Sequence, residues 1–457
     1  MKRKLDFLVA LLILAGLIFS ACTAQPAATT PQVTQAPAGA ATEETGGEEP
    51  AAGPSGEPIR IGSSLPLTGS FSIPGEKHED GYQLCVDLIN ERGGLLDRPV
   101  ELLVNDNQSD AESAISQFER FINVDNVDLI FGSFSSLITF PATSITEQSQ
   151  YVHPIPSAAA LRIYARGYEY LFYFQPNVAE YIGDSPIAML SDLVGTENLP
   201  KTAALVHADD FFANAIVAGL TGGEVAVEGL PEPISLAPGG LEEAGIEVVY
   251  SQQWPEQGFS DWITLANAIK ASNAEMLFAG VTSPDEAIQL IRAMQTVAYQ
   301  PQYVFMSQGA QREFQEQLGD AANGVTVHAS WHPLANFSGV LAGEEFTNQN
   351  FLDAFQEKYG RDPDEDEAIP FALCQGMEQA VRATGTTDNT ELRDWLAART
   401  AEDPVRTILG DFHWDERGLP VNKPFIMVQW QEGNLEFVYP QGAFPGVEDL
   451  VFPKPEW

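Results

Sequence analysis

Ser135 and Ser136 are two adjacent residues whose hydroxyl groups could bind a ligand. They follow a nearly pure apolar run over residues 127–131, which predicts a buried strand, and a helix is expected to begin near them. The first turn of a helix presents unpaired N–H groups and the positive end of its dipole, so this position favours an anion such as a carboxylate. Ser135 also suits capping of the helix, and the two roles are compatible.

Two histidines, His328 and His332, have the spacing of zinc ligands on a helix. However, the segment Val325–Ala329 predicts a strand, and Pro333 follows shortly after it. The two imidazoles would then not share a helical face. We therefore expect no metal site at these histidines.

The carboxylates Asp362, Asp364 and Asp366 imitate the first ligands of a calcium-binding loop. Such a loop needs glycine at its sixth position and a bidentate acid at its twelfth, where this chain has Glu367 and Leu373. The segment is therefore predicted to be a solvated acidic loop. No metal and no cofactor are expected.

Motifs for catalysis are missing from the sequence. It contains no Gly-x-Ser-x-Gly elbow, no Gly-x-x-x-x-Gly-Lys-Ser/Thr phosphate loop and no dinucleotide-binding fingerprint after the first predicted strand. No set of residues therefore indicates turnover of a substrate, and the chain is expected not to be an enzyme.

The elements that must position these side chains alternate between strand and helix. Predicted strands cover residues 59–62, 100–104, 127–131 and 151–155, and a second series covers 203–206, 248–250, 276–279 and 303–305. Helical spacing appears between them, for example over 262–271 and 286–294. This pattern predicts an α/β protein with two doubly wound, Rossmann-like lobes. The segment 221–245, rich in Gly, Glu and Pro, is predicted to be a surface insertion.

The start of the chain predicts export. Residues 1–21 have a basic start, a short apolar run and a small-residue end, as in a signal peptide. The Phe-Ser-Ala-Cys sequence that ends at Cys22 resembles a bacterial lipobox, which implies lipidation of Cys22 and attachment to the membrane outside the cytoplasm. Residues 23–57 lack aromatic side chains and consist mostly of small and polar ones, so residues 22–57 are predicted to form a disordered tether.

The net charge excludes some classes of partner. The formal charge is −41, and removal of residues 1–21, which carry three cations and one anion, leaves −43. A chain so acidic is not expected to bind nucleic acid or an anionic lipid surface. Beyond Cys22 the only cysteines are Cys85 and Cys374, both in apolar helical patterns. Buried free thiols are favoured over a disulfide there, although an exported protein permits one.

Six segments of the chain carry a family resemblance through their sequences, order and spacing: 59–69, 90–94, 105–109, 127–132, 156–159 and 410–418. Together they resemble the type I periplasmic binding proteins of the branched-chain amino-acid class. The resemblance extends from residue 58 to about residue 440 and implies two lobes, joined by a three-crossover hinge, that close over a small ligand. The first lobe is predicted to contain residues 58–176 plus about 333–405, and the second lobe 177–332 plus about 406–457.

The resemblance implies contacts to a ligand carboxylate. Members that bind leucine-like amino acids use a serine hydroxyl that corresponds to Ser136, with Ser135 beside it, and a backbone group that corresponds to Ser157. A family threonine corresponds to Ala159, so its hydroxyl is missing here.

The contacts to the rest of the ligand are also altered. The tyrosine that stacks on the ligand corresponds to Phe212, and a second tyrosine corresponds to Pro74. The acid that pairs with the ligand's ammonium corresponds to Gln308 or Gly309. A neutral amide does not replace a carboxylate opposite a desolvated ammonium, because charge-assisted hydrogen bonds are roughly twice as strong as neutral ones.

These changes predict a changed specificity. A pocket that keeps Ser136 and is lined by Phe134, Phe211, Phe212 and Trp331 suits a carboxylate or amide with an apolar body and no amine. Ordinary core packing is the alternative for Phe134 and Phe211, and Trp331 is supported only by its place after a predicted strand.

The resemblance implies a monomeric solute-binding lipoprotein that delivers a branched-chain amino acid, or a related carboxylate or amide, to the permease subunits of an ABC importer. The expected site comprises Phe134, Ser135, Ser136, Ser157, Ala159, Phe212 and Gln308. A receptor of the same fold that senses its ligand without transport is the alternative.

Overall fold

The computed structural model describes residues 54–222, 224–225, 233–235, 239–256 and 258–457. The predicted signal peptide, Cys22 and most of the predicted tether lie outside the described residues, as does much of the predicted insertion. Across the part that is described, no helix is both long and apolar enough to cross a membrane.

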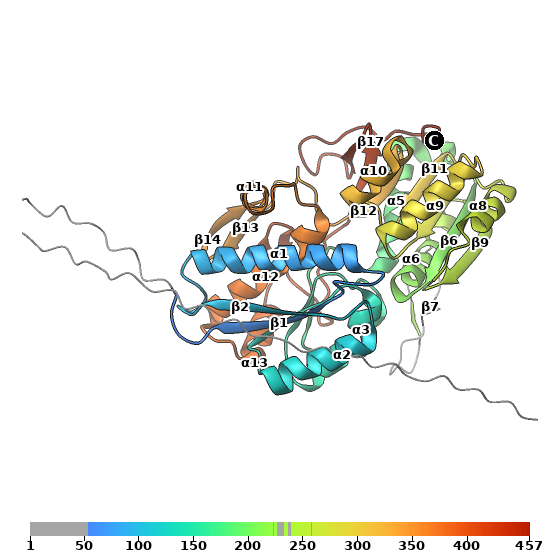
Figure 1. The fold of residues 1–457 in the computed structure, drawn as a ribbon. Helices are drawn as coiled ribbons and strands as arrows, with labels where there is room; N and C mark the ends of the chain where they lie inside the picture. Colours follow the sequence, from blue (N-terminus) through green and yellow to red (C-terminus); the bar gives the residue numbers. More distant parts are fainter. Residues whose placement is uncertain (1–53, 223, 226–232, 236–238, 257) are drawn as a thin grey trace, which may run out of the picture. The chain divides into compact units, whose positions relative to one another are not determined.

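The first half of the fold is built on parallel strands. Strands β1 (Ile59–Leu65), β2 (Val100–Asp106) and β3 (Leu129–Phe131) form a sheet in the order β2-β1-β3, and β4 (His153–Ile155) pairs with β5 (Leu171–Tyr173). The helices between them are α1 (Ser72–Glu91), α2 (Ala111–Arg120) and α3 (Ser136–Gln148). The predicted strands near 59, 100, 127 and 151 are therefore confirmed, and Figure 1 shows these elements in blue to cyan.

A second sheet has the order β18-β17-β12-β11-β10-β6-β9. Its strands are β6 (Thr202–Asp209), β9 (Glu247–Pro255), β10 (Met276–Gly280), β11 (Tyr303–Met306), β12 (Val325–Ala329), β17 (Ile426–Gln431) and β18 (Asn434–Tyr439). Pairing is parallel from β9 to β12 and antiparallel at β17 and β18. The predicted α/β class with parallel sheets is confirmed.

Side chains of this second sheet alternate between two cores, because successive residues of a strand point to opposite faces. Leu205, Phe278 and Phe305 pack in one core, whereas Val206 and Leu277 pack in the other. Both faces are covered by helices, so the central strands are apolar throughout, as expected of a parallel sheet. The helices are α4 (Ala179–Ile182), α5 (Asp184–Leu190), α6 (Phe211–Thr221) and α7 (Gly240–Glu243) on the first core, and α8 (Trp262–Ala271), α9 (Pro284–Thr296) and α10 (Arg312–Leu318) on the second.

A later segment returns to the first half of the fold. It contains α11 (Asn348–Tyr359), α12 (Glu365–Thr384), α13 (Asn389–Ala397) and the short strands β13 (Ser338–Leu341), β14 (Glu344–Thr347), β15 (Val405–Thr407) and β16 (Gly410–Phe412). Its apolar side chains share one core with α1 and β1, and α12 lies along α1 in Figure 1. The chain then passes back to β17 and β18, so three crossings join the two halves. The residue boundaries of the two lobes stay a prediction.

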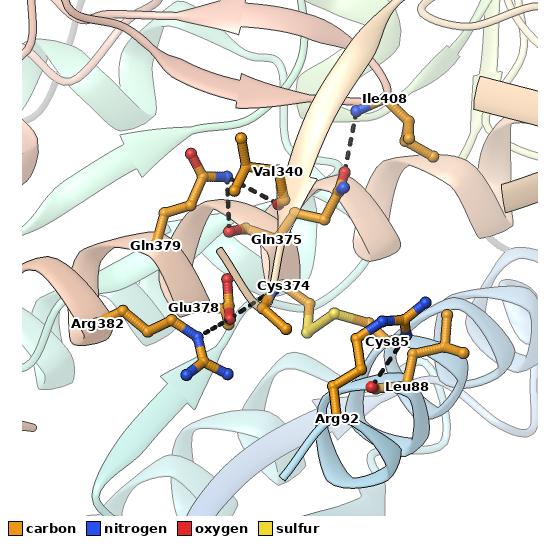
Figure 2. Close-up of a disulfide and its surroundings, with 11 residues drawn as sticks. Cys85, Leu88, Arg92, Val340, Cys374, Gln375, Glu378, Gln379, Arg382 and Ile408 are labelled. Atoms are coloured by element: carbon orange, nitrogen blue, oxygen red, sulfur yellow. Dashed lines mark hydrogen bonds and ion pairs between the residues drawn. A yellow bond between two sulfur atoms is a disulfide. The ribbon is translucent and has the colours of Figure 1, made fainter. Parts of the chain in front are cut away.

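Cys85 and Cys374 form a disulfide between α1 and α12, with an S–S distance of 2.07 Å (Figure 2). The expectation of free thiols is therefore wrong. Both residues are buried in helices, as predicted, but the packing of α1 along α12 brings their Cα atoms to 6.3 Å. That separation lies within the range that a disulfide spans. The two cysteines are 289 residues apart in the sequence, and no local sequence pattern predicts that they meet.

Helix α6, which begins beside the site described below, packs closely on α4 at Gly219. A Cβ atom at this position would overlap the backbone carbonyl of Glu180, which has no room to move aside as a flexible side chain would. We expect Gly219→Ala to lower the free energy of unfolding by about 1–3 kcal/mol through overpacking. Urea unfolding measures this change. Alanine favours a helix by about 1 kcal/mol over glycine, so a stabilised variant would contradict the close approach.

Candidate functional site

All seven residues predicted to contact a ligand line one pocket. They lie at or beyond the carboxyl ends of strands from both halves of the fold, where open α/β sheets bind ligands. The predicted residues are Phe134, Ser135, Ser136, Ser157, Ala159, Phe212 and Gln308. The sequence did not single out Tyr173, Gln175, Asp210, Thr282, Glu365 and Ile369 as lining residues, and it considered His328 and Asp366 only as metal ligands. That the seven predicted residues contact a ligand stays a prediction.

Ser135 and Ser136 lie at the start of α3, shortly after β3, as predicted. Ser135 occupies the N-cap position, but its side chain makes no capping hydrogen bond, and its buried Oγ has no hydrogen-bond partner among the residues that the structure describes. The capping interpretation is therefore wrong. Ser136 Oγ accepts a hydrogen bond from the Ala160 backbone N–H at 3.3 Å. The start of α3 thus offers the pocket a hydroxyl that the helix does not use.

The Ser157 hydroxyl is held by two neighbours. His78 Nδ1 lies 2.7 Å from the Pro74 carbonyl oxygen, so this nitrogen carries the proton and donates. Burial lowers the pKa of His78 to about 4, which keeps the ring neutral at pH 7 and makes Nε2 an acceptor. Ser157 Oγ, 2.9 Å away, therefore donates to Nε2 and accepts from Gln175 Nε2 at 3.0 Å. These bonds fix the loop after β4 against α1.

From the second sheet, Asp210 and Phe212 reach the pocket at the start of α6. Asp210 Oδ1 caps the helix by accepting from the backbone N–H groups of Phe212 at 2.7 Å and Ala213 at 3.1 Å. The residue is only 3% exposed, and its other oxygen, Oδ2, has no hydrogen-bond partner in the part of the chain that the structure describes. Burial raises the pKa of Asp210 to about 6, and its two capping hydrogen bonds only partly oppose that rise.

Two loops at the ends of β10 and β11 add polar side chains. Gln308 Oε1 accepts from Gln311 Nε2 at 3.1 Å, which uses one of the two lone pairs of this oxygen. The Thr282 hydroxyl donates to Glu286 Oε2 at 3.0 Å. The Glu286 carboxylate therefore lies next to the pocket, in contact with the lining residue Thr282.

Glu365 and Asp366 enter the pocket from the first turn of α12. Glu365 Oε2 accepts from the Ser330 backbone N–H at 2.8 Å, and Asp366 Oδ2 accepts from Gln311 Nε2 at 3.0 Å. Burial, and then the neighbouring Asp364 carboxylate, raises the pKa of Asp366 to about 7. Burial, followed by the Asp366 charge, raises the pKa of Glu365 well above its usual value.

The prediction of a solvated acidic loop at 362–366 holds for Asp362, which is exposed, but is wrong for the start of α12, where Asp366 is 4% exposed and Glu367 is fully buried. Asp364 and Glu367 form a capping box at the start of α12, in which each side chain accepts from the other residue's backbone N–H. An acid followed three residues later by glutamate, just before an apolar run, is a sequence signal that would have predicted this helix start.

Four buried polar atoms of pocket-lining residues have no hydrogen-bond partner among the described residues: Ser135 Oγ, Tyr173 Oη, Asp210 Oδ2 and His328 Nδ1. Buried polar groups in native proteins nearly always have a partner, so four such atoms around one pocket indicate a place for a polar ligand. Burial lowers the pKa of His328 to about 3, so its ring is neutral at pH 7.

Two aromatic residues expected in the pocket do not line it. Phe211 instead packs against Phe140, with ring centroids 5.3 Å apart, and beneath the Arg162 guanidinium at 4.3 Å. Trp331 is buried in the core around α12, where its Nε1 donates to Asn348 Oδ1 at 2.7 Å. Phe211 and Phe212 are the first two residues of α6, and successive side chains of a helix point about 100° apart, so the two rings face different surroundings. Within the described residues, no group of three or more His, Cys, Asp or Glu side chains is arranged to hold a metal ion.

A family model described as periplasmic binding protein matches residues 58–222 and 235–434. The chain belongs to this family. The resemblance to branched-chain amino-acid binding proteins is confirmed as well. The Leu/Ile/Val-binding protein homolog 1 of Brucella abortus (strain 2308) is 23% identical over 376 residues, which cover 82% of this chain and 91% of the relative. Homolog 7 of Brucella melitensis biotype 1 is 23% identical over 409 residues, covering 88% and 96%.

Solved structures of periplasmic binding proteins share the fold. The branched-chain amino acid transporter substrate-binding protein LivJ from Streptococcus pneumoniae, in complex with isoleucine, is 19% identical with a TM-score of 0.69, and covers 84% of this chain and 100% of its own. The leucine-binding protein LivK from Thermotoga maritima is 18% identical with a TM-score of 0.67, covering 83% and 98%. The type I fold expected from the sequence is thereby confirmed.

Proposed function

We propose that this periplasmic binding protein is an extracytoplasmic lipoprotein that captures a small polar ligand and delivers it to the permease of an ABC importer. The observation that carries the proposal is the pocket itself, because residues from both halves of the fold line it and four of them hold unpartnered polar atoms. Amino acids and their close analogues are the starting candidates, since LivJ of Streptococcus pneumoniae is described in complex with isoleucine. Cys22 is proposed to carry the lipid.

Capture requires that the two halves close around the ligand, a hinge motion typical of such folds. Contacts between the halves beside the pocket include Lys77 with Glu313 at 2.6 Å, Ser330 Oγ with Gln175 Oε1 at 3.0 Å, and Gln311 Nε2 with Asp366 Oδ2 at 3.0 Å. The Ser330 backbone N–H also donates to Glu365 Oε2 at 2.8 Å. Ligand is proposed to dock first on Ser136 and Ser157, after which Phe212 and these contacts close over it. The permease would then recognise the closed form.

Phe212 supplies the test of the pocket, and its neighbour Phe211 supplies a matched control. We expect Phe212→Ala to weaken ligand binding by about 10- to 100-fold, because one interfacial methylene group already contributes roughly 1 kcal/mol and an aromatic ring contributes more. Phe211→Ala should change affinity less than threefold, since Phe211 does not line the pocket. Isothermal titration calorimetry measures both, with the ligand found by a thermal-shift screen of amino acids, amides, carboxylates and amines.

A saturating ligand at 100 times its dissociation constant should stabilise the protein by about 2.7 kcal/mol, which such a screen detects. Equal effects of the two alanine variants would place the ligand elsewhere. A receptor that senses without transport remains the second candidate function. Uptake of the ligand by cells that lack this protein distinguishes them, because only transport requires it.

A further inference from the structure

The charged side chains that line the pocket are acidic. Among the described residues, three carboxylic acids line it, Asp210, Glu365 and Asp366, and no lysine or arginine does. The sequence-based expectation of a ligand without an amine depended on the loss of one family acid at Gln308. The structure shows that acids from two other elements, α6 and α12, face the same space.

Two cations close to the first turn of α12, Lys77 and Arg361, pair with other acids. Lys77 Nζ lies 2.5 Å from Asp364 and 2.6 Å from Glu313. Arg361 pairs with Glu367 at 2.5 Å and with Asp80 at 2.7 Å. Among the described residues, Glu365 and Asp366 therefore receive only hydrogen bonds from neutral groups, Ser330 and Gln311.

Asp210 lies in a second acidic region on the other sheet. Its Oδ1 is used by the α6 cap, but its buried Oδ2 has no hydrogen-bond partner within residues 54–457 as far as the structure describes them. The charges of Glu256, just after β9, and of Glu286 on α9 help to raise its pKa, after the larger effect of burial. Ionised carboxylates are costly to bury unless a cation or strong donors pair with them. A cationic group in the pocket would supply that partner.

We propose that the pocket takes a ligand of net positive charge, a small organic amine or basic amino acid whose cationic groups are held by Asp210 from α6 and by Glu365 and Asp366 from α12. The inference rests on the proposed function and specifies its ligand class. The groups that face Asp366 and Glu365 are Asp364, Glu313 and the committed Lys77, so the surroundings remain acidic as a whole. A bound cation lowers the pKa of each lining acid, so binding at pH 7 also releases protons.

Four probes of similar length separate the charges: hexanoate, L-norleucine, L-lysine and cadaverine. They carry in turn a carboxylate alone, a carboxylate with one ammonium, a carboxylate with two ammonium groups, and two ammonium groups alone. Calorimetry of the purified protein at pH 7 should show lysine or cadaverine binding at least tenfold more tightly than norleucine, and hexanoate more weakly still. Repeating the titration in buffers of different ionisation enthalpy measures the proton release.

Asp210→Asn and Asp366→Asn test the residues. Each is expected to weaken binding of the cationic probe at least tenfold and to reduce its advantage over norleucine. The α6 cap should survive the Asp210→Asn change, because the amide oxygen of an asparagine side chain also accepts hydrogen bonds at an N-cap. Glu316→Gln removes an exposed acid of α10 and should leave affinity unchanged.

Norleucine or hexanoate binding as tightly as the cations would overturn the inference and leave the proposed solute-binding function standing. Binding of none of the four probes would overturn it as well. The proposed function would fail separately, if the broader thermal-shift screen gave no ligand of any charge.

Discussion

Replacing Cys85 and Cys374 together by alanine is expected to lower the free energy of unfolding by about 3–5 kcal/mol. The disulfide closes a loop of 289 residues, and cross-links of long loops restrict the unfolded chain most. It also joins α1, which carries His78 and Lys77, to α12, which carries Glu365 and Asp366. Urea unfolding of the two proteins, with and without a reducing agent, measures the loss.

Reduction of the unmodified protein provides the control for side-chain volume. It should reproduce most of the loss seen in the double variant, because reduction removes the cross-link but keeps both sulfur atoms in the core. A reduced protein as stable as the oxidised one would show that the cross-link does not restrict the unfolded state.

Replacing Lys77 by methionine is expected to cost a further large amount, about 3–5 kcal/mol. The side chain is only 4% exposed, and its ammonium lies between Asp364 of the α12 cap and Glu313 of α10. Removing one member of a buried ion pair leaves the other charges without a partner. Burial alone would lower the pKa of Lys77, but the carboxylates of Asp364, Glu367, Asp366 and Glu313 outweigh it and raise the pKa.

The dependence of this loss on pH follows from the pKa shifts of Lys77 and Asp364. The Lys77 contribution is complete below the unfolded pKa of about 10.4 and persists until pH passes the raised folded value. Burial would raise the pKa of Asp364, but Lys77 and hydrogen bonds lower it overall, so its contribution is present above about pH 4 and is lost as pH falls through the folded value. The part of the loss that comes from the Asp364 pair should therefore be nearly constant between about pH 5 and pH 9. Asp366, whose pKa burial raises to about 7, also faces Lys77, so the total loss should grow as pH rises through that value.

Lys358→Met is the matched control. Lys358 pairs with Asp87 at 2.6 Å, but both side chains are substantially exposed, at 29% and 39%. Exposed pairs typically contribute less than 1 kcal/mol, so this variant should unfold almost as the unmodified protein does. Equal losses for the two lysine variants would show that burial does not decide the value of the Lys77 pairs.

The ligand proposal changes the meaning of the residues at Ala159 and Gln308. Their departure from the family pattern indicated an altered specificity, and both line the pocket. The direction of the change was inferred from one missing acid. The carboxylates of Asp210, Glu365 and Asp366 favour the opposite direction, toward ligands that carry more positive charge.

The sequence by itself determined the order of strands and helices and the seven lining residues. Apolar runs such as 276–279 and 325–329 specify buried strands locally, because a strand covered on both faces must be apolar throughout. Once the strand order is known, residues just after those strands gather at one edge of each sheet. This places Ser135 and Ser136 at one edge of the first sheet. Ser157 and Gln308 were singled out by the resemblance to the family, which also implied that the two lobes meet around the ligand.

Only the tertiary structure decided which distant side chains pair and which face the pocket. The disulfide depends on α12 lying along α1, and the burial of Glu365 and Asp366 depends on where that helix begins against the second sheet. Phe211 and Phe212 are neighbours in the sequence, yet the rotation of about 100° per helical residue points only one of them into the pocket. Such contacts arise from packing between segments far apart in the chain, and local sequence patterns do not encode them.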